Sequence, residues 1–258
     1  MNNILSKSEI ANLKINGQKL AQVVSELIDN IKPGADATMI EGLAEDLLQK
    51  AGLVPAFKNY FVYGAGSYPA CTCISVNEEV VHGLPTLQKV FKEGDLVSID
   101  IGAEYRGVYS DMAVTVPVGK ISASDQKLLD KTKESLCRGI EMARIGNHIG
   151  SIGGAIEKVA VGNGLGIVKD YVGHGIGRKP QLPPQIPNFG SAGEGPKILE
   201  GMALAIEPML TLGNGETEVR TDGWTVVTSD HSKAGHFEHT IVIENGKPVV
   251  VTEVENNK

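Results

Sequence analysis

The two halves of the chain repeat the same order of segments, and this repetition limits the folds that it can adopt. Each half begins with two stretches that carry apolar residues at helical spacing and continues with strand-like segments. The predicted helices lie at about residues 6–30, 38–52, 122–144 and 148–163. Chance similarity between short hydrophobic strands is one explanation, but three matching segments in the same order favour an internal duplication with pseudo-twofold halves of about 1–120 and 121–258.

The boundaries of the second helix follow from local capping signals. Thr38 and Glu41 form a capping-box pattern, which predicts that this helix begins at Thr38. Gly52 is expected to end it, because glycine readily adopts the left-handed conformation found after helices. The equivalent glycine of the second half is Gly164.

Acidic residues lie inside two apolar strand segments of the first half. Asp100 follows the apolar run 96–99, Asp111 precedes a similar run, and residues 105–107 between them are predicted to turn the chain. A hairpin symmetric about residues 105 and 106 would place the two carboxylates directly opposite each other. Such a pair would repel, so either one carboxylate stays protonated or a bound cation neutralises both. Aspartate is disfavoured inside strands, and local rules are most often broken at functional sites.

The second half repeats this arrangement with Glu207 and Glu238, each next to an apolar run. A solvated strand face could explain any one of these acids, but not four at matching places in two halves. His174 lies in the segment GHGIG, where it is either an ordinary loop residue or an accessible ligand. Four carboxylates and one imidazole suit two divalent ions of Mn, Fe, Co or Zn. Two such ions about 3.5–4 Å apart can deprotonate a bridging water, which predicts metal-assisted hydrolysis.

The composition argues against several other classes of protein. Net charge is −7 and no basic block occurs, which argues against nucleic-acid binding as the main activity. No uncharged stretch is apolar enough for a membrane span, and the start of the chain lacks the apolar region of a signal peptide. The 3 cysteines cannot all pair with one another, so a reducing compartment fits best. We therefore expect a cytoplasmic protein with one domain, residues 1–258.

Motifs of other catalytic mechanisms are absent from the sequence. It contains no GxSxG nucleophile elbow, no Walker A loop and no HExxH helix. The glycines of 162–166 have the wrong spacing for a dinucleotide-binding loop. Cys73 could act as a thiol nucleophile only with a nearby base, which the sequence does not reveal.

Several motifs together make the sequence similar to the type I methionine aminopeptidases. They are HGLP at 82–85, SIDIG and SD around the two aspartates, GHGIG at 173–177, IEPM at 206–209, DGWTVVT at 222–228 and FEHT at 237–240. All five metal-ligand positions of that family match in order and spacing. The resemblance implies the pita-bread fold, an α+β fold in which the helices of two pseudo-twofold-related halves back a curved antiparallel sheet. The short gaps around Glu207 resemble type I and not type II, which has an inserted helical subdomain.

The resemblance also implies two divalent metal ions and a role for each matching residue. Asp100, Asp111 and Glu238 would contact one or both ions, with Asp111 and Glu238 as the bridging pair. His174 and Glu207 would complete the shell of the first ion. Glu207 would in addition accept a proton from the bridging water, whose hydroxide is the nucleophile.

Further matching residues would contact the substrate. His82 would hydrogen-bond the substrate near the scissile amide. Tyr68, Cys73 and Trp224 match positions around the methionine pocket, although each would also pass as an ordinary core residue. Gln181 occupies a position where the family usually has a second active-site histidine. Its amide can donate a hydrogen bond to the substrate carbonyl but cannot carry a proton, so a loss of rate is expected.

Other departures from the family pattern concern the pocket and leave the metal ligands unchanged. Val62, Ala65 and His236 stand where the pocket is often lined by Cys, Tyr and Gln, and Pro180 replaces a larger apolar residue.

The resemblance implies a cytoplasmic enzyme that removes the initiator methionine from nascent proteins when the second residue is small. Its partner would be the N-terminal peptide of the nascent protein, with the ribosome as a further candidate, no DNA or membrane partner, and a monomeric state. Two alternatives stay open. A related metallo-aminopeptidase that cleaves before proline would share the ligand set, and a non-catalytic binding protein on the same fold is favoured by Gln181 alone.

Overall fold

The computed structural model describes residues 4–253, and their helices and strands follow the repeated order expected from the sequence. The helices are α1 Lys7–Ile28, α2 Ala37–Ala51, α3 Ala123–Met142 and α4 Ile149–Gly162. The strands are β1 Val54–Pro55, β2 Phe61–Val62, β3 Gly66–Ser67, β4 Thr72–Val76, β5 Glu79–Val81, β6 Leu96–Tyr105, β7 Val108–Pro117, β8 Gly166–Ile167, β9 Gly173–Gly175, β10 Leu182–Ile186, β11 Ala203–Ile206, β12 Met209–Thr211, β13 Thr217–Val219, β14 Val226–Thr228, β15 Ala234–His236, β16 Glu238–Glu244 and β17 Lys247–Val250.

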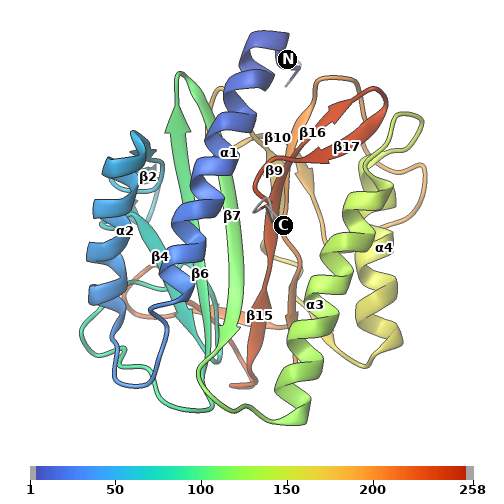
Figure 1. Ribbon diagram of the computed structural model, residues 1–258. Coiled ribbons are helices and arrows are strands. Elements are labelled where there is room, and N and C mark those ends of the chain that lie inside the picture. The colour runs from blue at the N-terminus through green and yellow to red at the C-terminus, as the bar shows by residue number, and fades with distance from the viewer. Residues whose placement is uncertain (1–3, 254–258) are drawn as a thin grey trace.

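The main sheet is antiparallel and joins the first and second parts of the chain at its centre. Its strand order is β1-β6-β7-β16-β11-β9-β10, with β4 also paired to β6 and β17 to β16. The long pair β6 and β7 therefore lies beside the pair β16 and β11. Figure 1 shows the four helices on one face of this curved sheet. Helix α1 crosses β6 and β7, and α2 lies beside β4 at the outer edge. Helices α3 and α4 cover the second half of the same face. The predicted α+β class, with helices backing a curved antiparallel sheet, is confirmed.

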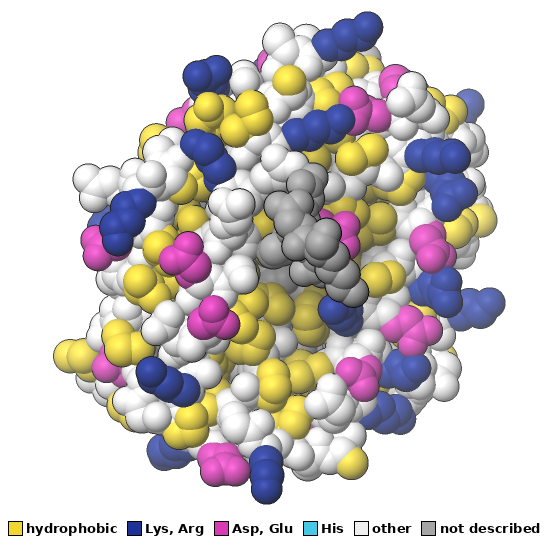
Figure 2. Space-filling model, viewed as in Figure 1, with side chains coloured by type: hydrophobic (Ala, Val, Ile, Leu, Met, Phe, Trp, Pro, Cys, Tyr) yellow, Lys and Arg dark blue, Asp and Glu magenta, His cyan; other side chains and the backbone are white. Residues whose placement is uncertain are grey.

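Two hydrophobic clusters hold the helices to the sheet. In the first, Leu20 of α1 and Ile40 of α2 pack with Ile99 of β6. In the second, Leu128 of α3 and Ile152 of α4 pack, among others, with residues of β11 and β16. Complete burial of each such side chain contributes about 1.5–3 kcal/mol, so the helical layer fixes the strands from one side and leaves the other face for polar groups. Figure 2 shows acidic and basic side chains interspersed over the face that carries the helices.

The start of α2 differs from the prediction. The helix begins at Ala37, and Asp36 is its N-cap, with Oδ1 accepting from the backbone N–H groups of Thr38 and Met39 at 2.9 and 3.0 Å. The Glu41 side chain does not cap the helix; its Oε1 accepts a hydrogen bond from the backbone N–H of Cys71 at 2.6 Å. The predicted capping box is therefore wrong, because an aspartate two residues earlier takes the cap and Glu41 has a tertiary partner. The predicted stop is confirmed, since Gly52 is the C-cap with φ of 68°.

The β6–β7 hairpin has a different register from the predicted one. Tyr105 pairs with Val108, so that Arg106 and Gly107 form the turn with φ of 50° and 82°. Two-residue hairpin turns require such positive φ values, because they match the twist of the strands. Asp100 consequently lies opposite Ala113, and the predicted direct opposition of Asp100 to Asp111 is wrong. The two aspartates are diagonal neighbours on one face, about 7–8 Å apart at Cα.

Candidate active site

Three adjacent strands bring acidic residues to one place on the sheet. Asp100 lies in β6, Asp111 in β7, and Glu238 begins β16. Ala113 pairs with Asp100 on one side and with Glu238 on the other. A short side chain at this central position leaves the space between the two acids open. The carboxylates predicted from the repeated pattern therefore converge on the seam between β7 and β16.

A fourth carboxylate and an imidazole approach from the neighbouring strands. Glu207 directly follows β11, and His174 in β9 pairs with Ala205 of that strand. His174 Nε2 lies 3.7 Å from Glu207 Oε1, while its Nδ1 lies 3.0 Å from the carbonyl oxygen of Gly175. This contact orients the ring so that Nε2 points to the acids. Gly173 is required beside it, because a Cβ there would lie 2.5 Å from the carbonyl oxygen of Ala205.

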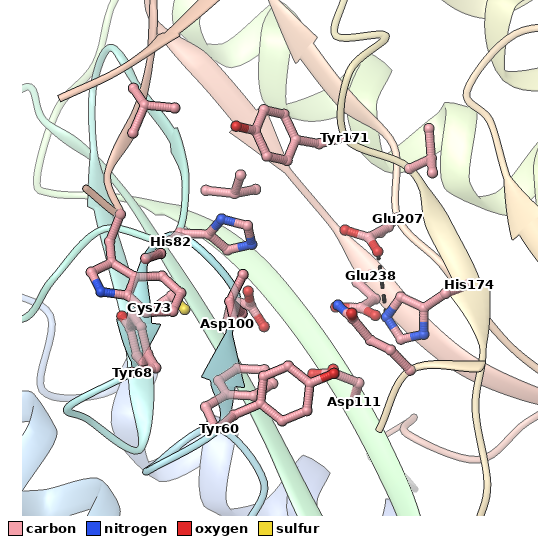
Figure 3. A pocket seen from close by; sticks show the side chains of 18 of the residues that line it. Tyr60, Tyr68, Cys73, His82, Asp100, Asp111, Tyr171, His174, Glu207 and Glu238 are labelled. Atoms are coloured by element: carbon pink, nitrogen blue, oxygen red, sulfur yellow. Dashed lines mark ion pairs between the residues drawn. The ribbon is translucent and has the colours of Figure 1, made fainter. Parts of the chain in front are cut away.

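The acids open into a cavity with a volume of about 350 Å³, which is large enough for a small peptide end. Figure 3 shows Asp100, Asp111, Glu207 and Glu238 directed toward one another, with His174 beside them. All of the residues predicted for the site line this one cavity. They are Tyr68, Cys73, His82, Asp100, Asp111, His174, Gln181, Glu207, Trp224 and Glu238.

Burial perturbs all four carboxyl groups in the same direction. Loss of hydration raises the pKa of Asp100 to about 7 and that of Glu207 to about 7. The pKa values of Asp111 and Glu238 are also well above their ordinary values, because burial is reinforced by the neighbouring carboxylates. Four carboxylates so close together are costly in the ionised state unless a positive charge lies between them.

The donor set fits metal ions. Among residues 4–253, Asp100 Oδ1, Asp111 Oδ1 and Glu238 Oε1 are buried oxygens without a hydrogen-bond partner. Ligand atoms of Asp111, His174 and Glu238 lie within 4.8 Å of one another. Carboxylate oxygens and a neutral imidazole are suitable ligands for Mn, Fe, Co or Zn. The unpartnered oxygens and their spacing are what a site for divalent cations requires.

An aromatic wall lies on one side of the acids. Tyr68 and Trp224 meet edge to face, with ring centroids 5.0 Å apart. The Tyr68 hydroxyl donates to the carbonyl oxygens of Thr72 at 3.1 Å and Gly83 at 3.2 Å. Asp222 holds the Trp224 loop, since its Oδ1 accepts from the Trp224 backbone N–H at 2.8 Å. These contacts preform an apolar recess next to the acidic cluster.

Cys73 and His82 complete the wall of this recess. Cys73 pairs with Asp100 across β4 and β6, and burial raises the pKa of its thiol well above the ordinary value. A nucleophilic cysteine needs the opposite shift, so the thiol is a packing group. His82 has φ of 57° and packs edge to face on Tyr171, with centroids 5.5 Å apart. Burial, together with nearby His236, lowers the pKa of His82 to about 4, which keeps its ring neutral.

Sequence reasoning did not assign a role at the acids to His236, and it missed Tyr171. His236 is 1% exposed, and its Nε2 lies 3.4 Å from Glu207 Oε2. Its burial lowers its pKa, although Asp100 opposes this shift. A histidine in a short apolar strand gives no signal that separates a ligand from a core residue. Tyr171 lies in the segment between β8 and β9 and likewise carries no motif of its own.

A second acidic group lies elsewhere on the chain but is satisfied by the protein itself. Ligand atoms of Glu41, Glu45 and Cys71 lie within 4.8 Å of one another. Glu41 accepts from the backbone N–H groups of Cys71 and Thr72, and Glu45 pairs with Lys58. These partners make the group a structural one that ties α2 to β4.

Comparison with known proteins identifies the family. Residues 11–245 match the model of metallopeptidase family M24. The chain is 40% identical over 252 residues to a methionine aminopeptidase of Clostridium acetobutylicum, which covers 98% of this chain and 99% of that protein. It is 44% identical over 256 residues to a methionine aminopeptidase of Aquifex aeolicus, with 97% and 98% covered.

Solved structures agree with this assignment. A methionine aminopeptidase from Thermotoga maritima matches with a TM-score of 0.94 at 43% identity, covering 98% of this chain and 100% of that chain. A prolidase from Pyrococcus furiosus matches with a TM-score of 0.77 at 22% identity, covering 98% of this chain and 66% of that chain, and this likeness shows the fold alone.

The pita-bread fold and the buried acids beside His174 therefore define a metal-dependent peptidase. The chain belongs to metallopeptidase family M24 and, within it, to the methionine aminopeptidases. Within residues 4–253, none of the helices has the length and apolar character needed to cross a membrane.

Proposed function

We propose that this enzyme removes the N-terminal methionine from nascent proteins with the help of two divalent metal ions. Asp100, Asp111, His174, Glu207 and Glu238 would hold them. The observation that carries the proposal is the convergence of four carboxylates and His174 in one cavity. Three buried oxygens of these carboxylates lack a hydrogen-bond partner among the described residues. Identities of 40% and 44% to methionine aminopeptidases, over nearly the full length of the chain, support the substrate.

The metal pair, when bound, supplies a water activated as hydroxide and a Lewis acid for the scissile carbonyl. Glu207 accepts the proton of the attacking water at its carboxylate and later returns it to the leaving amine. Its position at the end of β11, inside the cavity, supports this role.

Tyr68, Cys73 and Trp224 bind the methionine side chain. Their support is the apolar recess that they line beside the acids, since a thioether packs well on aromatic ring edges. A recess of fixed shape selects the first residue. The preference for a small second residue, which the family resemblance implies, belongs to the same proposal.

Two polar side chains orient the scissile amide. His82 is neutral near neutral pH, since burial lowers its pKa to about 4, and its ring can donate one N–H to the substrate. Gln181 lines the cavity beside His174 and donates its amide to the substrate carbonyl oxygen as negative charge develops there.

The remaining expectations on organisation and environment belong to the same proposal. The chain works as one catalytic domain with halves of about 1–120 and 121–258, in the cytoplasm and as a monomer. Its partner is the N-terminal peptide of a nascent chain, with the ribosome as a further candidate. Cobalt, manganese, iron and zinc are the candidate metals, because each suits oxygen and imidazole ligands.

Peptide hydrolysis tests the proposal. Metal-free protein is reloaded with Mn or Co and mixed with Met-Ala-Ser or with an Ala-Pro peptide, and the released amino acid is quantified. We expect metal-dependent release of methionine alone. Asp111→Asn keeps the size of the side chain but removes a ligand charge and should abolish it, whereas Asp130→Asn on the surface of α3 is the matched control. Release of alanine but not methionine, or tight metal binding without cleavage, would contradict the proposal.

A further inference from the structure

The side chain of His236 has an unmet requirement for a partner. It is 1% exposed at the end of β15, and among residues 4–253 neither ring nitrogen has a hydrogen-bond partner. Its Nε2 lies 3.4 Å from Glu207 Oε2, a distance at which the two groups are close but are not joined by an aligned hydrogen bond. Burying an unpartnered polar group costs free energy. A ligand that binds a nitrogen of this ring would therefore lower the free energy of the folded protein.

The backbone around His236 is fixed, so the position of the ring is a built feature. Thr115 Oγ1 accepts from the His236 N–H and donates to the His236 carbonyl oxygen, both at 2.8 Å. Ser98 hydrogen-bonds the same Thr115 hydroxyl at 2.8 Å. On the other side, His236 pairs with Met209 of β12. The ring is thus presented to Glu207 from a strand end that is held on two sides.

The potential ligand atoms around the seam form two groups that share Glu238. One group is Asp111, His174 and Glu238, and the other is Glu207, His236 and Glu238. In each group, one ligand atom from every residue lies within 4.8 Å of the others. Each group therefore offers two carboxylates and one imidazole, a donor set that suits a divalent transition metal.

We propose that His236 Nε2 is a metal ligand, so that the site holds two adjacent ions with one imidazole available to each. The inference rests on the proposed metal-dependent function and adds a sixth ligand to the five assigned above. It accounts for the unpartnered Nε2, because coordination supplies the interaction that this nitrogen lacks. A direct hydrogen bond to Glu207 is the competing explanation.

Proton NMR of the Co(II)-loaded protein tests the assignment without measuring activity. A histidine bound through Nε2 keeps an exchangeable Nδ1–H proton, and the paramagnetic ion moves its resonance out of the ordinary range. We expect two such resonances in water that disappear on exchange into D2O, one from His174 and one from His236. His236→Gln should show only one, because its amide can still donate toward Glu207 but is a poor metal ligand.

The matched control is His82→Gln, which changes a histidine that lines the cavity and belongs to neither group, and it should keep both resonances. Calorimetric titration with Co(II) gives a second readout. We expect His236→Gln to weaken the binding of one ion by at least about 10-fold, and His82→Gln to leave the affinity unchanged.

A single exchangeable resonance in the fully loaded wild-type protein would overturn the proposal. This count does not depend on the folding of any variant. An unchanged Co(II) affinity in folded His236→Gln would overturn it as well. Failure of the proposed function has a different signature, namely no metal-dependent release of methionine by the wild-type protein.

Discussion

Asp100→Asn should make the metal-free protein more stable at alkaline pH while removing a metal ligand. Burial raises the pKa of Asp100 from 3.8 to about 7, so the folded state binds this proton more tightly than the unfolded state does. The carboxyl group therefore favours folding below about pH 4, and this contribution is lost as pH rises from about 4 to about 7. An asparagine of the same size carries no charge and avoids the loss.

The magnitude follows from the size of the pKa shift. A rise of about 3 units corresponds to about 4 kcal/mol, because each unit is worth 1.36 kcal/mol. Asp100 is partly exposed to the cavity, where water screens its charge, so about 2 kcal/mol is the lower expectation. At pH 8, Asp100→Asn should therefore raise the free energy of unfolding of the metal-free protein by about 2–4 kcal/mol.

Urea unfolding in the presence of a chelator, at pH 5 and pH 8, measures this difference. The wild-type free energy of unfolding should fall between the two pH values, and the fall should be smaller in Asp100→Asn. Glu104→Gln, at the partly exposed end of the same strand, is the control and should follow the wild type. A wild-type free energy that stays level or rises with pH would refute the reasoning, as would a variant that is less stable at pH 8.

Three further outcomes are expected. Gln181→His should raise kcat for Met-Ala-Ser by about 10-fold or more, since an imidazole can carry a proton as well as donate a hydrogen bond; steady-state kinetics decides, and a slower variant contradicts this. Gly173→Ala should cost about 1–3 kcal/mol in a urea unfolding curve, because its Cβ would lie 2.5 Å from a carbonyl oxygen of β11. Iodoacetamide at pH 8 should modify exposed Cys137 well before buried Cys73, whose thiol pKa is raised. Mass spectrometry of the digested protein measures the order, and modification of Cys73 as fast as Cys137 would contradict this expectation.

The fold was largely predictable because its signals are long and periodic. Four helices with apolar faces extend over many residues, and the repeated order of segments constrains how they can be arranged. The errors occurred where one or two residues decide the outcome. Asp36 caps α2 in place of Thr38, since both residue types are good caps and the sequence does not show that Glu41 bonds to β4.

The hairpin register shows the same limit at the site itself. Arg106 and Gly107 form the two-residue turn, and arginine is not among the residues whose presence predicts a positive φ. A shift of the turn by one residue moves the pairing of Asp100 from Asp111 to Ala113. The partner of Asp100 thus moves by two positions along β7. Because side chains alternate along a strand, Asp100 and Asp111 still lie on the same face of the sheet. The prediction of a shared site therefore survived an error in its geometry.

The sequence revealed those site residues whose placement is energetically unfavourable without a compensating partner. Asp100 and Glu238 stood out because a carboxylate inside an apolar strand is unfavourable unless something compensates for it. His236 and Tyr171 break no local rule, since either side chain can pack in a core without a ligand. Only their positions in the folded chain, 3.4 Å from Glu207 for His236 and against His82 for Tyr171, connect them with the site. A pattern in the sequence thus identifies the groups that need a metal ion, whereas the groups that surround it become visible only in three dimensions.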